Sequence, residues 1–216
     1  MTKILVVAEH FDGEIISSTS KTVNCASQIS ESIDVLVLGN DNSIASKAST
    51  IEAVTNVLTI SNEAFEYPVS SILSPVVAEI SKEYDCILLP SSTFGRDLAP
   101  RISAILDVNQ VTDIMSVEGE RVFKRPIYAG NAIQTIKIAD GQKILGTVRT
   151  ASFKELGNSN SANVAWSMDR VAPYARKNRA CDVCLGVLCN PLPLRHAPPL
   201  PWFTGTLMLT VMGYGA

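Results

Sequence analysis

The sequence predicts an α/β fold built on an open, mostly parallel sheet with helices on both faces. Two observations predict this sheet: short runs that are apolar throughout, such as KILVVAEH at residues 3–10, and the segments of helical periodicity that separate these runs. Strands without polar alternation are typical of parallel sheets that are covered on both faces. A third observation, a change of pattern after Asp107, predicts antiparallel strands added to the sheet.

Strands and helices alternate over the first half of the chain. The apolar runs predict strands at residues 3–10, 34–39, 57–61 and 86–90, and the periodic segments predict helices at residues 18–30, 43–50, 69–84 and 98–106. In the third helix, Ile72, Leu73, Val76 and Ile80 recur at the spacing of one helical face. This alternation predicts a Rossmann-like arrangement, in which helices connect parallel strands.

After Asp107 the strand-like segments follow one another without intervening helices. They cover residues 113–119, 121–130, 132–141 and 143–150, and the short turns EGE, GN and DGQ join them. Turns of this length and composition connect antiparallel neighbours. All four segments are therefore expected to be antiparallel additions.

A change of composition divides the chain near residue 157. Residues 1–156 carry a net charge of −6, whereas residues 157–216 carry a net charge of +3. The second segment has no Glu, but it has both tryptophans and six of the eleven prolines. The second segment begins with GNSNSAN, which is typical of a flexible connector. We therefore expect one domain at residues 1–156 and a linker with an irregular, poorly ordered tail at residues 157–216. The tail's composition fits a shifted reading frame, with a natural divergent C-terminus as the alternative.

Composition excludes several classes of protein. The chain is 46% hydrophobic and 18% charged, as a globular protein is, and its net charge of −3 argues against nonspecific nucleic-acid binding. No apolar run is long enough for a membrane span, and the N-terminus lacks the features of an export signal. Five cysteines, an odd number, fit a reducing compartment, so a cytoplasmic location is expected.

Motifs for catalysis and nucleotide binding are missing from the sequence. No G-x-G-x-x-G follows the first strand, and no P-loop motif occurs. His10 could act as a base, but no nucleophile lies near it in the sequence, which favours a structural hydrogen bond. No catalytic residue is therefore assigned.

The cysteines do not predict a metal site. Cys181, Cys184 and Cys189 with His196 have a spacing that matches no zinc motif we can justify, and the surrounding prolines offer no scaffold. Cys25 and Cys86 lie on apolar patterns and are expected to be buried in the core.

The stretch SSTFGRDLAPRISAIL at residues 91–106 joins the fourth strand to the fourth helix. Asp97 is expected to be the N-cap, with Gly95 at a sharp turn. Arg96 and Arg101 then lie near the positive end of the helix. Two interpretations remain open: a surface ion pair between Asp97 and Arg101, which is the commoner case, or a sheet edge that meets a phosphate, a carboxylate or an acidic partner.

Several segments in order resemble a known family. KILVVAEH, LLPSSTFGRDLAPRISAIL, TDIMSVEG, FKRPIYAGNAI and GTVRTASF are together similar to the N-terminal domain of the electron transfer flavoprotein alpha subunit. The resemblance covers residues 1 to about 156. Five segments in the same order are far more specific than any isolated motif.

The resemblance implies a partner and a cofactor. Alpha subunits of this family pair with a beta subunit, and the heterodimer carries one FAD, takes electrons from acyl-CoA dehydrogenases and passes them to a quinone-linked oxidoreductase. Most contacts to FAD come from a C-terminal domain with a Ser-Gly-Gly-Arg-Gly segment, which this sequence lacks. We therefore expect this chain alone to bind FAD weakly or not at all, and we transfer no cofactor-binding residue. The matched motifs imply partner-facing or domain-ordering roles for Gly95, Arg96, Asp97, Arg101, Arg125, Tyr128 and Asn131.

The expected function is that of a truncated electron transfer flavoprotein alpha subunit. Such a chain is a component of an FAD-dependent carrier in fatty-acid β-oxidation, not a catalyst with its own substrate, and its place is the mitochondrial matrix if the source is eukaryotic. The alternative is a redox-inactive fragment that acts only as an interaction module for the beta subunit. An unrelated nucleotide-binding enzyme is the weakest hypothesis, because a Ser-Gly-Gly-x-Asp-Ser phosphate loop is missing.

Overall fold

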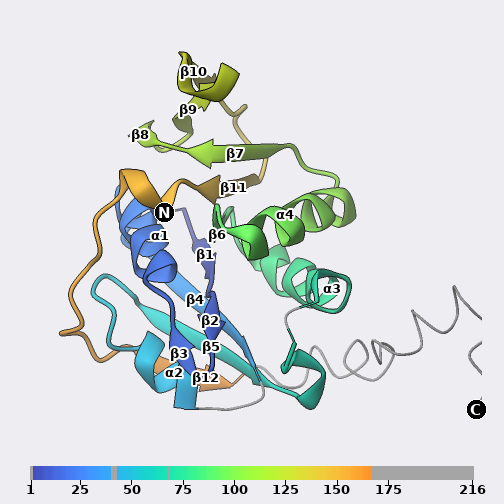
Figure 1. Ribbon diagram of the computed structural model, residues 1–216, viewed down its shortest axis with the longest axis vertical. Coiled ribbons are helices and arrows are strands. Elements are labelled where there is room, and N and C mark those ends of the chain that lie inside the picture. The colour runs from blue at the N-terminus through green and yellow to red at the C-terminus, as the bar shows by residue number, and fades with distance from the viewer. Residues whose placement is uncertain (1, 40–42, 68, 167–216) are drawn as a thin grey trace, which may run out of the picture.

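A seven-stranded parallel sheet forms the centre of the protein. The computed structural model describes residues 2–39, 43–67 and 69–166, and within them the strand order is β12-β5-β4-β1-β6-β11-β7 (Figure 1). The strands of this sheet are β1 (Ile4–Val7), β4 (Ile33–Gly39), β5 (Asn56–Ser61), β6 (Cys86–Pro90), β7 (Gln110–Ile114), β11 (Ile144–Val148) and β12 (Asn163–Trp166). Every pairing between them is parallel, which confirms the predicted fold class.

Helices cover both faces of the sheet. Helices α1 (Ser17–Ser27) and α2 (Ser43–Ala48) lie on one face, and α3 (Ser70–Ile80) and α4 (Thr93–Leu106) lie on the other (Figure 1). Successive strand residues alternate between two apolar layers: Ile4 and Val6 of β1 belong to the first layer, and Leu5 and Val7 to the second. This division explains why β1 is apolar at every position. Among the described residues, four short 3₁₀ turns complete the helical elements: η1 (Glu63–Phe65), η2 (Ser81–Glu83), η3 (Tyr128–Gly130) and η4 (Thr150–Ser152).

A small hairpin follows the first strand. Strands β2 (His10–Phe11) and β3 (Glu14–Ile15) pair antiparallel across Asp12 and Gly13, which have φ of 51° and 74°. An Asp-Gly pair is the usual sequence for such a turn, so the signal was present in the sequence. Nε2 of His10 lies 2.7 Å from the carbonyl oxygen of Leu38, which is the expected structural hydrogen bond.

The predicted antiparallel set was too large. Of the four segments expected to be antiparallel, three contribute the strands of an antiparallel sheet: β8 (Ser116–Gly119), β9 (Val122–Ile127) and β10 (Ala132–Lys137). Residues 143–150, expected to join them, instead contribute β11, which pairs parallel with β6 and β7. The physical reason is burial, because all five residues of β11 are buried as in a central strand. The turn between β10 and β11 therefore leads the chain from the antiparallel sheet back to the parallel sheet.

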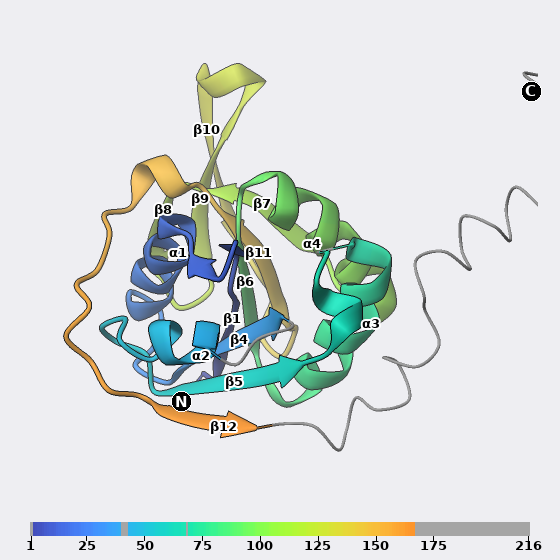
Figure 2. The ribbon, with the colours of Figure 1, turned by 60° about the horizontal axis from the view of Figure 1, so that its bottom comes forward.

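Residues 154–162, here called the strap, run along the domain and lead into β12. The backbone N–H of Glu52 donates to the carbonyl of Gly157 at 3.0 Å, and the N–H of Ala162 donates to the carbonyl of Ser49 at 3.0 Å. The expected linker thus contacts the domain from Gly157 onward, and β12 pairs with β5 as an edge strand (Figure 2). Residues after 156 thus also pack against the domain. The predicted domain boundary at residue 157 stays a proposal.

Asn160 is the main side-chain anchor of the strap. Its Nδ2 donates to the carbonyls of Ile51 and Val54 at 3.1 and 2.8 Å. Replacing Asn160 with alanine leaves both partly buried carbonyls without these donors, so we expect the free energy of unfolding to fall by about 1–3 kcal/mol. Urea unfolding measures this change. Exposed Asn158 makes no hydrogen bond within the described residues, and N158A is the matched control with an expected change of about 0.5 kcal/mol or less.

Cys181, Cys184, Cys189, His196 and the proline-rich stretch lie outside the described residues. In the part of the chain that the structure describes, no helix combines the length and apolar character that crossing a bilayer requires.

Candidate functional site

The junction between β6 and α4 differs from its sequence-based description. Helix α4 begins at Thr93, and Ser92 is its N-cap, with its hydroxyl accepting from the N–H of Gly95 at 3.4 Å. Asp97 lies within the second turn and is not the cap, so that prediction was wrong. Pro100 consequently lies inside the helix rather than in its first turn. It is tolerated there because Arg96 and Pro100 are both exposed, and water can reach the carbonyl that loses its partner.

Gly95 serves close packing rather than a sharp turn. It lies within α4, and its φ is not in the left-handed region. A Cβ atom added at this position would lie 1.9 Å from the carbonyl oxygen of Pro90, which is far inside van der Waals contact. The glycine therefore lets the first turn of α4 approach the end of β6. It orders the domain and offers no side chain to a partner.

Arg96 takes part in an ion cluster that the sequence did not predict. Its Nη2 lies 3.8 Å from Oδ1 of Asp113, and Nη1 of Arg149 lies 3.8 Å from Oδ2 of the same carboxylate. The hydroxyl of Ser91 donates to Asp113 at 3.0 Å, and Nε of Arg96 donates to Ser91 at 3.1 Å. Asp113 has a φ of 59°, a left-handed conformation that Asp tolerates better than most residues. One carboxylate thus joins α4, β7 and the end of β11.

The ion pair between Asp97 and Arg101, one of the two interpretations of this stretch, does not form. Across residues 2–39, 43–67 and 69–166, neither side chain has an ion pair or hydrogen bond, and both are exposed. A hollow of about 410 Å³ lies beside the ion cluster and is lined by Ser91, Arg96, Pro100, Gln110, Thr112, Asp113 and Thr147. The ion cluster has two positive charges, on Arg96 and Arg149, and one negative charge, on Asp113. It therefore has a net positive charge.

A second hollow lies where the strand order reverses. Because β1 lies between β4 and β6, the carboxyl ends of β1 and β6 flank the position at which α/β sheets usually place ligands. The hollow measures about 370 Å³ and is lined by Glu9, His10, Phe11, Ile16, Ser70, Thr93, Phe94, Asp97 and Leu98. This lining holds two carboxylates and neither Lys nor Arg, so it disfavours the phosphates of a nucleotide.

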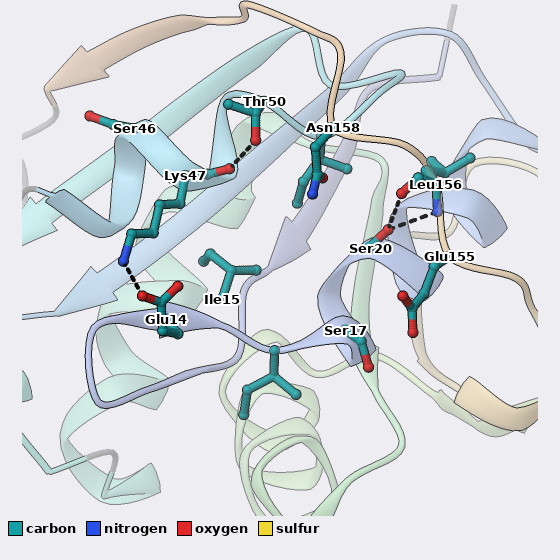
Figure 3. Close-up of a pocket in the computed structure, with 12 residues that line it drawn as sticks. Glu14, Ile15, Ser17, Ser20, Ser46, Lys47, Thr50, Glu155, Leu156 and Asn158 are labelled. Carbon is teal, nitrogen blue, oxygen red and sulfur yellow. Dashed lines mark hydrogen bonds and ion pairs between the residues drawn. The ribbon is translucent and has the colours of Figure 1, made fainter.

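A third hollow, of about 530 Å³, opens between α1, α2 and the strap (Figure 3). Figure 3 shows Lys47 directed toward Glu14, and their Nζ and Oε1 atoms are 2.5 Å apart. The hydroxyl of Ser20 accepts from the N–H of Leu156 at 2.9 Å. The polar groups of this hollow are used to fasten the hairpin and the strap to the helices.

Arg125, Tyr128 and Asn131 lie on a projecting hairpin that we call the arm (residues 122–137, comprising β9, η3 and β10). The arm extends away from the seven-stranded sheet in both views (Figures 1 and 2). Tyr128, Ala129 and Gly130 at its tip have φ of 50°, 55° and 93°. The N–H of Asn131 closes this turn by donating to the carbonyl of Tyr128 at 3.1 Å. These three predicted residues therefore share one element, separate from α4.

Cys25 and Cys86 are buried thiols, as predicted. Burial raises the pKa of Cys25 from 9.0 to about 12. Burial also raises the pKa of Cys86, with a smaller contribution from the neighbouring Cys25. Both thiols therefore stay protonated and unreactive at neutral pH. Within the described ranges, no three His, Cys, Asp or Glu side chains are grouped to hold a metal ion.

Comparison with known proteins gives the family. Residues 4–167 match the family described as "Electron transfer flavoprotein domain". The electron transfer flavoprotein subunit alpha of Pseudomonas aeruginosa is 40% identical over 151 residues, which cover 69% of this chain and 48% of that protein. The mitochondrial subunit alpha of Dictyostelium discoideum is 37% identical over 183 residues, which cover 80% of this chain and 51% of that protein. The subunit alpha of Paracoccus denitrificans is 30% identical over 187 residues.

The chain spans about half the length of the first two of these relatives. The family match covers the parallel sheet, its helices, the arm and the strap, and it includes more than half of the sequence. On this evidence, the chain belongs to the electron transfer flavoprotein domain family.

Proposed function

We propose that this chain acts as an electron transfer flavoprotein alpha subunit, and that its described domain pairs with a beta subunit. In such a complex FAD carries electrons from acyl-CoA-type dehydrogenases toward a quinone-linked oxidoreductase. The observation that carries the proposal is the match of residues 4–167 to the family, together with relatives named as alpha subunits. The electron donors, the acceptor and the beta subunit are parts of this proposal.

The described residues do not fit FAD. FAD contains a pyrophosphate, which is usually bound by backbone N–H groups at a helix N-terminus or by cations. The hollow at the reversal of strand order includes Thr93 and Phe94 of the first turn of α4, but Glu9 and Asp97 add two carboxylates and no Lys or Arg lines it. In the hollow beside the ion cluster, Arg96 is paired with Asp113. In the hollow beside α2, Lys47 is already paired with Glu14. We therefore derive no redox step from this domain and assign it the role of binding and positioning a partner subunit.

Co-expression with a beta subunit from a homologous complex tests the proposal. A copurified complex with a flavin absorbance spectrum close to one FAD per complex supports the carrier function. A colourless complex supports the alternative, an interaction module without redox activity. Absence of any complex at micromolar concentrations contradicts both.

A further inference from the structure

The arm has the features of a docking element. Tyr128 is 79% exposed and Ile133 is 59% exposed, and both lie near the tip of the hairpin. Large apolar side chains held this far from the core do not stabilise the isolated domain. Three consecutive left-handed residues, two of them not glycine, add strain at the same place. Strain and exposed apolar surface at one tip are more typical of a binding element than of an ordinary turn.

The charge of the arm is opposite in sign to that of the whole chain. The arm contains Lys124, Arg125 and Lys137 and no acidic residue, whereas the chain has a net charge of −3. Lys124 is compensated by Glu118, with Nζ and Oε1 2.9 Å apart, and this contact lowers the pKa of Glu118. Arg125 and Lys137 have no such partner within the described residues. Arg125 lies near the apolar tip, opposite Gln134, whereas Lys137 lies at the base of the arm, opposite Val122.

Arg125 also carries a donor that the domain leaves unused. Its Nε is buried and has no hydrogen-bond partner among the described residues. Leaving a buried charged donor unsatisfied costs free energy, and because Nε is covered by the domain, a carboxylate from outside can bond to it only if the Arg125 side chain moves. Arg125 directly opposes Gln134 across the hairpin, and Pro126 opposes the exposed Ile133. Cationic and apolar positions thus occupy neighbouring rungs of the arm.

We propose that the arm inserts into an apolar cleft of the beta subunit that has an acidic rim. Tyr128 occupies the apolar part, and Arg125 pairs with a carboxylate at the rim. Charge complementarity favours this occupant, because the arm carries three basic residues and no acidic residue. This inference rests on the proposed function, since it takes the beta subunit as the partner. It adds which element docks, which side chains contribute most to affinity, and the chemistry of the partner's surface.

Affinity measurements on arm variants test the inference. We expect Y128A to weaken binding of the beta subunit at least 30-fold, because buried tyrosines are frequent interface hot spots. Alanine and tyrosine both carry a Cβ, so the substitution leaves the strain of the left-handed backbone in place. The matched control is Y67A, which removes a tyrosine that is 71% exposed elsewhere on the domain and is expected to change affinity less than twofold. Unfolding curves of both variants should superimpose on that of the unmodified chain.

A second variant tests the charge of the partner. R125Q keeps a polar side chain but removes the charge, and it is expected to weaken binding about tenfold at low salt and to reduce the salt dependence of binding. If the unmodified chain binds the beta subunit while Y128A and R125Q bind equally well, the arm is not the docking element and the proposed function stands. If the unmodified chain does not bind, the proposed function itself fails. Self-association of the chain that Y128A abolishes, with unchanged binding of the beta subunit, assigns the arm to a second copy and also overturns the inference.

Discussion

Replacing Gly95 with alanine is expected to destabilise the domain by about 3 kcal/mol or more, or to prevent folding altogether. The added Cβ would lie 1.9 Å from the carbonyl oxygen of Pro90 and 3.3 Å from Cβ of Leu89. The first clash is with backbone at the end of a central strand, so no side-chain rotation relieves it. Either α4 moves away from the sheet or β6 shifts against β1 and β11, and both changes disrupt buried contacts. Urea unfolding followed by circular dichroism measures the loss.

Gly119 supplies the control for this substitution. A Cβ at Gly119 meets no heavy atom within 4 Å, and its φ is not in the left-handed region. G119A should therefore be neutral within about 0.5 kcal/mol or slightly stabilising, because alanine restricts the unfolded chain more than glycine does. Equal stability of G95A and the unmodified chain would show that α4 does not approach β6 as closely as described.

The central strands could be predicted because burial on both faces leaves a simple pattern. Residues 86–90 were predicted exactly as β6, and all five are buried, so nothing in the local sequence competes with the strand signal. The helices were also found, but their ends were less accurate. For α4, both Ser92 and Asp97 are good N-cap residues, and Pro100 shifted the prediction to Asp97, because proline is commonest in the first turn. The close contact of Gly95 with Pro90 favours a helix that begins at Thr93, and the local sequence does not reveal this contact.

Strand β12 was missed because its stability comes from contacts distant in the sequence. GNSNSANV contains few apolar residues and reads as a connector. The strap nevertheless receives hydrogen bonds from the turn after α2, and its Asn160 donates to that turn. Polar side chains that bond backbone groups more than 100 residues away leave no periodic signal. The same holds for the bond between Asp113 and Arg149, which the sequence alone did not bring together.

The candidate site residues illustrate a similar limit. Family likeness selected seven residues, but it did not separate those that order the domain from those that are available to a partner. The structure places Gly95 in a packing contact and Arg96 in an ion cluster. It places Tyr128 on an exposed tip. The roles of Gly95 and Arg96 follow from the approach of α4 to β6 and β7, which is a property of the three-dimensional packing. Exposed Tyr128 and partly exposed Arg125 therefore stay candidates for direct contact with another chain.

Stability at alkaline pH is expected to fall steeply, because two thiols are buried in the first apolar layer. Cys25 lies on α1 and Cys86 on β6, and burial raises the pKa of both. Below about pH 9.0, the ordinary thiol pKa given above, both thiols stay largely protonated in the folded and in the unfolded chain. Above that pH the unfolded chain releases both protons while the folded chain retains them, so the unfolded state is favoured. Each thiol then lowers the free energy of unfolding by about 1.4 kcal/mol per pH unit.

Between pH 9 and pH 11 the two thiols together should therefore remove about 5 kcal/mol of stability, which is comparable to the total stability of many domains. Urea unfolding at a series of pH values, with a non-thiol reductant present, measures this decline. The C25A/C86A double variant should lose about 1–2 kcal/mol at pH 7 through the small cavities, yet show a much flatter decline up to pH 10. Above pH 10 a residual slope is expected from Tyr84, because burial and its hydrogen bond to Asp34 raise the pKa of the phenol. If the unmodified chain and the double variant lose stability in parallel from pH 9 to pH 10, the buried thiols do not control the alkaline limit. That result would contradict the described burial of Cys25 and Cys86 between α1 and β6.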